Sequence, residues 1–232
     1  MAILHFPPIE TASREGLLAI GGDLEVASLK LAYENGIFPW PTEEYPLLWF
    51  APPRRAILEF KDLRVPKRMQ RELKNKKFRF AIDRDFSSVI EACAEGRTRR
   101  SDGTWINPMM LDAYQRFHKA GHAHSFEVYN EAGQLAGGLY GVGLGKMFAG
   151  ESMFFHESGA SKAALIYAVE YLKSKGGRWM DIQMMTPLLR NLGAKEISRK
   201  VFMEKLGTAV KAPPLFDFPP ARPHDHPSHS RD

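Results

Sequence analysis

The segment HSFEVYNEAGQLAGGLYGVGLGKMFAGESMF, residues 124–154, decides the fold class. It contains three runs with the composition of β-strands, at residues 124–130, 135–142 and 147–154. The sequences between these runs, EAG at 131–133 and GLGK at 143–146, are typical of tight turns. Three strands joined by such short turns predict an antiparallel meander.

Helical segments flank this meander on both sides. Before it, Asp85 is suited to cap a helix that runs to about Glu95, and Asn107 followed by Pro108 predicts a second helix that ends at Gly121. After it, the sequence predicts a helix opened by Ser158 or Ser161 and running to residue 173, a strand at 179–184, and short helices at 187–192 and 198–206. This order predicts an α/β (α+β) fold with a mixed sheet.

The first sixty residues have a different character, because they are rich in proline, glycine and aromatic residues. One helix is expected there, capped by Asp23 and ended by Gly36. Prolines interrupt long ladders, so we expect a small domain at residues 1–62 that packs on a larger domain at 63–210. The Pro- and His-rich tail at 211–232 lacks periodicity and is expected to be disordered.

Composition limits the classes of protein that remain. A chain of 232 residues with 44% hydrophobic content can bury its own core, and its single cysteine, Cys93, lies in a helical pattern typical of a buried thiol. The sequence has no leader-like start and no apolar run long enough to span a membrane, so we expect a cytoplasmic protein. The net charge of +5 favours polyanionic partners, and residues 64–79 contain eight basic residues against Glu72 alone.

Several tempting motifs do not predict a site. The glycine-rich residues 141–147 lack the spacing of a P-loop or a dinucleotide fold and are better explained as a hairpin turn. Neither the histidines at 118, 122 and 124 nor those in the tail have a second ligand cluster, so no metal is expected. No G-x-S-x-G elbow or Cys–His arrangement is present, so covalent catalysis has no candidate nucleophile.

Three polar residues lie inside apolar strands. Glu151 interrupts the run at 147–154, and alternation in the strand at 179–184 would put Asp181 and Gln183 on one face. Burying such groups is costly unless they are paired or used in function. The pattern alone leaves open whether they form a reactive site or a satisfied structural network.

Read together, several segments resemble the leucyl/phenylalanyl-tRNA protein transferase family. They follow one another in the family's order over about residues 20–206. The segments are GGDL at 21–24, GIFPW at 36–40, GTWI at 103–106, GHAHS at 121–125, GGLYG at 137–141, FAGESMF at 148–154, ASK at 160–162, DIQ at 181–183 and LGA at 192–194.

The resemblance implies a GNAT-like acyltransferase domain behind a small N-terminal domain, with no cofactor. It implies transfer of Leu or Phe, and less readily Met, from aminoacyl-tRNA to proteins with N-terminal Arg or Lys, which marks those proteins for N-end rule degradation. We expect the protein to act as a monomer. The implied site comprises the catalytic positions Asp181 and Gln183, assisted by Glu151, and the substrate positions Trp49, Trp105, Leu139, Phe148 and Ser152. The basic residues that we expect to contact phosphates of the tRNA are Lys67, Arg68, Arg71, Lys74, Lys77 and Arg97, next to Arg99 and Arg100. A solvated helix face without a partner is the alternative explanation of this segment.

On this basis we expect the Gln183 oxygen, polarised by Asp181, to accept a proton from the attacking amine. Asp181 and Glu151 would also attract an N-terminal Lys or Arg. Two other classes remain open. An acetyl-CoA-dependent N-acetyltransferase would need a Q/R-x-x-G-x-G/A motif, which RNLGAK at 190–195 misses at its last position. A non-catalytic RNA-binding protein would explain the basic segment but not the acidic residues in the strands.

Overall fold

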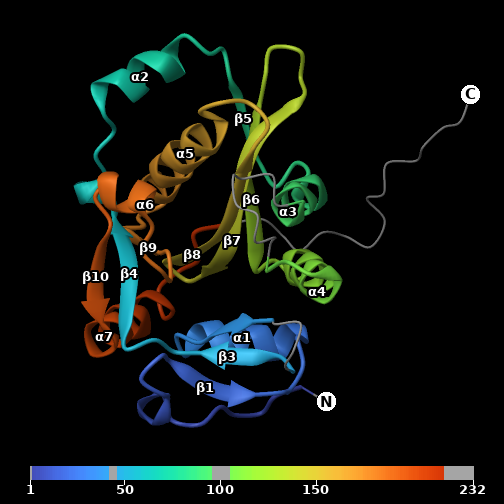
Figure 1. Ribbon diagram of the computed structural model, residues 1–232, viewed down its shortest axis with the longest axis vertical. Helices are drawn as coiled ribbons and strands as arrows, with labels where there is room; N and C mark the ends of the chain where they lie inside the picture. The colour runs from blue at the N-terminus through green and yellow to red at the C-terminus, as the bar shows by residue number, and fades with distance from the viewer. Residues whose placement is uncertain (1, 42–45, 96–104, 217–232) are drawn as a thin grey trace, which may run out of the picture.

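The computed structural model describes residues 2–41, 46–95 and 105–216, and in these ranges the chain forms two sheets (Figure 1). The larger sheet has the strand order β10-β4-β9-β8-β7-β6-β5. Its neighbours are antiparallel except β8 and β9, which pair in parallel at Ala149 and Asp181. The strands are β4 (Arg54–Glu59), β5 (Arg79–Ile82), β6 (Ala123–Tyr129), β7 (Leu135–Leu144), β8 (Met147–Phe155), β9 (Trp179–Asp181) and β10 (Lys195–Ser198).

The predicted meander and the mixed α/β class are confirmed, since β6, β7 and β8 follow one another as antiparallel neighbours. The ladder between β7 and β8 contains one irregularity. Tyr140 pairs with Ser152 and Gly141 pairs with Gly150, so Glu151 is the extra residue of a β-bulge. A Cβ at Gly141 would lie 2.2 Å from the Ala149 carbonyl oxygen, so only glycine permits this close approach.

Helices cover both faces of the larger sheet and create a hydrophobic core on each (Figure 1). The helix α5 (Ala160–Ser174) covers one face, and α3 (Phe86–Ala94) and α4 (Pro108–Lys119) cover the other. The predicted caps of α3 and α4 are confirmed, because Asp85 accepts from the Ser88 amide and Asn107 from the Met110 amide. The remaining helices of this unit are α2 (Lys67–Lys74), α6 (Pro187–Asn191), α7 (Arg199–Ala209) and the short 3-10 helix at Phe60–Asp62.

The N-terminal unit is a small sheet, β1 (Leu17–Ile20), β3 (Leu48–Phe50) and β2 (Phe38–Trp40), with the helix α1 (Val26–Glu34) and a 3-10 turn at Ile9–Thr11. Helix α1 packs against α4 and β7, so this unit contributes to the core on the α3–α4 side of the larger sheet. The expectation that Asp23 caps α1 is wrong, since the capping position is Glu25. Asp23 instead accepts from the Ser28 hydroxyl at 2.6 Å.

The larger unit begins earlier than the expected boundary after residue 62. Strand β4 lies between β10 and β9 in the larger sheet, and its residues 55–58 are all buried. Such a run is typical of a central strand, whereas the prolines at 52 and 53 interrupt the small sheet just before it.

The end of the chain also differs from the expectation of a disordered tail from residue 211. Leu215 is 1% exposed, and Phe216 stacks on His124 with ring centroids 3.7 Å apart. Residues 217–232, including the tail histidines, lie outside the described part of the chain.

Candidate active site

A pocket of about 290 Å³ lies between residues 38–40 of the N-terminal unit and residues of β8 and the segment that follows β9. Its walls are largely apolar, and polar side chains gather at one place. The aromatic wall is Phe38, Trp40 and Trp105, the aliphatic wall includes Leu139, Leu165, Met180, Ile182 and Leu189, and the polar part consists of Glu151, Ser152, Gln183 and Thr186. Such a combination of apolar walls with a few polar groups is typical of a small-molecule site.

The bulge in β8 creates the polar part of the pocket. Gly150, Glu151, Ser152 and Met153 all line it, although consecutive residues of a regular strand point to opposite faces. The extra residue lets Glu151 join its neighbours on the pocket side.

The side chain of Gln183 reaches the polar part of the pocket because its backbone is left-handed. Strand β9 ends at Asp181, which corrects the prediction of a strand to residue 184, and Gln183 has a left-handed backbone with φ +51°. That conformation is unusual for a residue with a side chain. It is held because the Gln183 amide donates to Asp181 Oδ1 at 2.9 Å, and the Gln183 carbonyl accepts from the Ala56 amide at 3.1 Å.

Glu151 and Gln183 are joined by their side chains. Nε2 of Gln183 donates to Oε1 of Glu151 at 2.6 Å. Within the described residues no protein group donates to Gln183 Oε1, so this oxygen can accept from a substrate. The pair therefore presents an amide oxygen and a carboxylate to the pocket.

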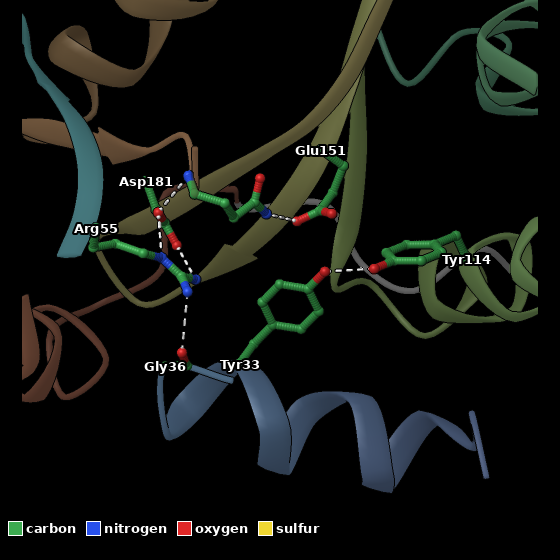
Figure 2. Close-up of polar contacts among 7 residues, drawn as sticks. Tyr33, Gly36, Arg55, Tyr114, Glu151 and Asp181 are labelled. Carbon is green, nitrogen blue, oxygen red and sulfur yellow. Dashed lines mark hydrogen bonds and ion pairs between the residues drawn. The ribbon is translucent and has the colours of Figure 1, made fainter. Parts of the chain in front are cut away.

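Burial raises the pKa of Glu151 to about 7, from an ordinary value of 4.5. Hydrogen bonds from Tyr33 and Gln183 and the charge of Arg55 oppose this rise, whereas the charge of Asp181 adds to it. The hydroxyls of Tyr33 and Tyr114 bond to each other beside Glu151 (Figure 2). Burial and the Glu151 charge raise the pKa of both tyrosines well above the usual range, so both stay neutral.

Asp181 lies behind the pocket and is paired with Arg55 (Figure 2). Nε and a terminal nitrogen of Arg55 donate to its two carboxylate oxygens at 2.9 and 2.6 Å, and both side chains are 2% exposed. The expected polarisation of the Gln183 side chain by Asp181 is therefore wrong. Asp181 holds the Gln183 backbone, and the Gln183 side chain bonds to Glu151.

The structure brings together most of the predicted substrate positions. Trp105, Leu139 and Ser152 line the pocket with Glu151 and Gln183. Two predicted positions, Phe148 and Trp49, do not line it. Phe148 is fully buried in the α5-side core against Phe126 and Phe216. Trp49 is also fully buried, packs on Phe6 and donates from Nε1 to the Gly21 carbonyl.

The sequence interpretation missed Trp40, which stacks on Trp105 with ring centroids 5.7 Å apart and an interplanar angle of 18°. Trp40 lies in the GIFPW motif, so its signal was present but was assigned to the wrong tryptophan. Arg55 was also missed. The sequence signal for Arg55 is a charged residue directly before the apolar residues 56–58 of β4.

The basic residues predicted to contact tRNA lie on and just after α2. Lys67, Arg68, Arg71, Lys74 and Lys77 are all exposed, with Arg68 paired to Glu72 and Lys77 to Glu131. Arg97, Arg99 and Arg100 lie outside the described residues. Across the described ranges no cluster of three potential metal ligands occurs, and no helix is both long and apolar enough to cross a membrane.

Comparison with known proteins gives a consistent result. A family model described as leucyl/phenylalanyl-tRNA protein transferase matches residues 57–207, and the model of that family's N-terminal domain matches residues 22–53. The curated leucyl/phenylalanyl-tRNA–protein transferase of Syntrophobacter fumaroxidans is 48% identical over 207 residues, which cover 89% of this chain and 88% of that protein. The transferase of Maridesulfovibrio salexigens is 46% identical over 210 residues, covering 90% and 88%.

Two solved structures show weaker likeness. One is a GCN5-related glucosamine N-acetyltransferase region of a fungal β-N-acetylglucosaminidase, with TM-score 0.45 and 14% identity over 62% of this chain and 20% of that one. The other is L-PGS from Bacillus licheniformis, with TM-score 0.40 and 13% identity over 68% and 50%. Likeness at this level adds nothing to the assignment.

Proposed function

This chain belongs to the leucyl/phenylalanyl-tRNA protein transferase family, and we propose that its pocket binds the aminoacyl end of the tRNA while Glu151 and Gln183 carry out the transfer. It is thus an aminoacyl-tRNA–protein transferase. Family membership decides against an acetyl-CoA-dependent acetyltransferase and a non-catalytic RNA-binding protein.

The aliphatic wall of the pocket is suited to a leucyl or phenylalanyl side chain. Leu165, Met180, Ile182 and Leu189 offer a surface that charged side chains cannot enter without losing their hydration. One methylene group in an apolar pocket discriminates by only about 1–3 kcal/mol. The pocket therefore does not exclude methionine, and we propose that methionine is accepted less readily than leucine or phenylalanine.

The stacked Trp40 and Trp105 form a platform for the terminal adenosine of the tRNA. An aromatic side chain stacked on a base contributes about 1–3 kcal/mol, whatever the base. The exposed basic residues of α2 then contact phosphates of the acceptor stem, which gives affinity without sequence preference.

The chemistry requires a neutral amine at an ester carbon. An α-amine has a pKa of about 7.7–8.0, so part of it is neutral near pH 7. Gln183 Oε1 accepts a hydrogen bond from this amine and orients it toward the ester. An amide oxygen is too weak a base to keep the proton, whereas the Glu151 carboxylate, with a pKa of about 7, is suited to receive it.

The bonds then change in a balanced way. The amine nitrogen forms the new amide bond to the carbonyl carbon, and the ester bond from that carbon to the ribose oxygen breaks. The proton that leaves the amine passes to Glu151 and from there to the departing ribose oxygen. No cofactor is needed for this exchange.

The protein substrate carries an N-terminal Arg or Lys, which fits a negative charge at the polar part of the pocket. Since Arg55 neutralises Asp181, Glu151 is the pocket-lining carboxylate that supplies this charge. We also propose that the protein acts as a monomer. Leucylation of such proteins in the cytoplasm, as a mark for N-end rule degradation, is the role that we propose.

The observation that carries this proposal is the hydrogen bond between Gln183 and Glu151 beside an apolar pocket. The test is transfer of leucine from Leu-tRNA to a peptide that begins with Arg, compared with a peptide that begins with Glu. Gln183→Ala should lower kcat at saturating substrates by about 10²-fold. Normal turnover by that variant would disprove the assigned site.

A further inference from the structure

Arg55 is a buried charge that touches no pocket-lining polar group, yet it contacts elements from three parts of the fold. Its guanidinium lies between the rings of Phe38 and Phe202, 4.6 and 4.7 Å from their centroids. A terminal nitrogen also donates to the Gly36 carbonyl at 3.3 Å, beside the bidentate pair with Asp181 (Figure 2). Every face of the guanidinium is therefore held, and its orientation is fixed.

From these contacts we infer that Arg55 is the positioning residue for Gln183, acting through Asp181. This inference rests on the proposed role of Gln183. Asp181 Oδ1 accepts from both Arg55 Nε and the Gln183 amide, at 2.9 Å each. The two donors share one oxygen, so the direction of the guanidinium sets where the Gln183 backbone is held.

The register of the strands explains why Arg55 can do this. Ile57 of β4 pairs with Asp181 of β9, and Arg55 is two residues earlier on the same face of β4. Its side chain therefore reaches Asp181 diagonally across the strand pair, a separation that long side chains span.

Without the contact to Asp181, the backbone at Gln183 would adopt a more favourable conformation. Gln183 has φ +51°, a strained conformation for a residue with a side chain. If the Asp181 carboxylate turns, the Gln183 amide loses its acceptor and the left-handed turn opens. Nε2 of Gln183 then leaves Glu151, and the amide oxygen no longer faces the amine of the substrate.

The same arginine also joins the two walls of the site. Gly36 and Phe38 belong to the segment that carries Trp40 into the pocket, whereas Asp181 leads to Gln183. Arg55 therefore contacts segments on both sides of the pocket.

A purely structural ion pair would affect stability without affecting turnover, and this difference provides the test. We would measure kcat and KM for Leu-tRNA with Arg55→Lys, which keeps the charge but loses the planar fork, and with Arg55→Gln. Positioning predicts a kcat lower by about 10- to 100-fold in folded protein, with KM changed by less than about threefold. Unchanged kcat, or a loss confined to KM, would overturn the inference.

Arg54→Gln is the matched control, because Arg54 precedes Arg55 on β4 but its side chain is 64% exposed. It should have the kcat and melting temperature of the wild type. If it lowers kcat as much as Arg55→Gln does, the effect belongs to the strand and the inference fails.

Removing one partner of a buried ion pair can prevent folding. We would therefore also measure the double variant Arg55→Gln/Asp181→Asn, in which both charges are removed. It leaves no uncompensated charge and should be more stable than Arg55→Gln. Its kcat should remain at least about 10-fold low, because two amides cannot reproduce the bidentate clamp. Wild-type kcat in this double variant would overturn the inference.

Gln183→Ala, assayed alongside, separates the two proposals. If it abolishes transfer while the Arg55 variants turn over normally, the proposed site stands and the positioning role falls. If Gln183→Ala turns over normally, the proposed site falls and the positioning role falls with it.

Discussion

Glu151 accepts a 2.6 Å hydrogen bond from the side-chain amide of Gln183, 32 residues away in the chain. The contact depends on two backbone irregularities, a β-bulge at Glu151 and a left-handed turn at Gln183. It directs the amide nitrogen of Gln183 to a carboxylate whose pKa is about 7.

Glu151→Gln should lower kcat for aminoacyl transfer by about 10²- to 10⁴-fold, the usual contribution of a positioned proton acceptor. The fold should survive, because an amide can occupy the same half-buried space. The check is the rate of leucine transfer at saturating Leu-tRNA and peptide. A loss of less than about threefold would show that the amine proton goes elsewhere.

The stability of the protein should depend on pH through Glu151. Its folded-state pKa of about 7 is above the ordinary 4.5, so the folded state holds the proton more tightly than the unfolded state. The contribution is present below about pH 4.5 and is lost as the pH rises to about 7, so the free energy of unfolding falls over this window.

Relative to Glu151→Gln, which cannot titrate there, wild-type protein should lose about 2–3 kcal/mol between about pH 4.5 and pH 7. Urea unfolding of both proteins at a series of pH values measures the difference. A constant difference across the series would contradict the raised pKa.

Trp40 and Trp49 should behave as different kinds of residue. Trp40→Leu removes the stack on Trp105 and should raise KM for Leu-tRNA by about 10-fold, with little change in melting temperature. Trp49→Leu removes a fully buried ring and its bond to Gly21, and should cost about 3 kcal/mol of stability without raising KM. Thermal melts and KM for each variant give the comparison. A raised KM for Trp49→Leu and a loss of stability for Trp40→Leu would show that Trp49, and not Trp40, contacts the tRNA.

The basic face of α2 should act through charge alone. Lys67→Gln, Arg71→Gln and Lys74→Gln together should weaken tRNA binding and make it less sensitive to salt. Each lost phosphate contact should reduce the slope of log K against log salt by about one. Lys200→Gln, at an exposed position of α7, is the control and should leave the slope unchanged. An unaltered slope in the triple variant would place the tRNA on another surface.

Local signals were sufficient for much of the fold. The meander, the caps of Asp85 and Asn107, and the helices around them follow from short-range patterns, and all are present. The length of β9 could not be predicted, because its end depends on Asp181 turning to Arg55, which lies 126 residues away. Docking of Phe216 on His124 is likewise a long-range contact that composition does not reveal.

For the site, the sequence identified the carboxylates and the glutamine but not how they are connected. Alternation suggested that Asp181 and Gln183 share a face, and the structure joins them through a backbone turn instead. The partner that redirects Asp181 is Arg55, the buried one of two adjacent arginines at the start of β4, and its role is visible only once β4 pairs with β9.

The bulge in β8 makes the length of that strand, as well as its composition, a determinant of activity. Because residues before and after Glu151 alternate in opposite phase, deleting one residue would restore a regular ladder while keeping every other side chain in the chain. The neighbours of Glu151 would then no longer all face the pocket, although the rest of the sequence would be unchanged. When related sequences are aligned, a gap between Gly150 and Ser152 should therefore be treated as a change to the site, as a substitution of Glu151 would be.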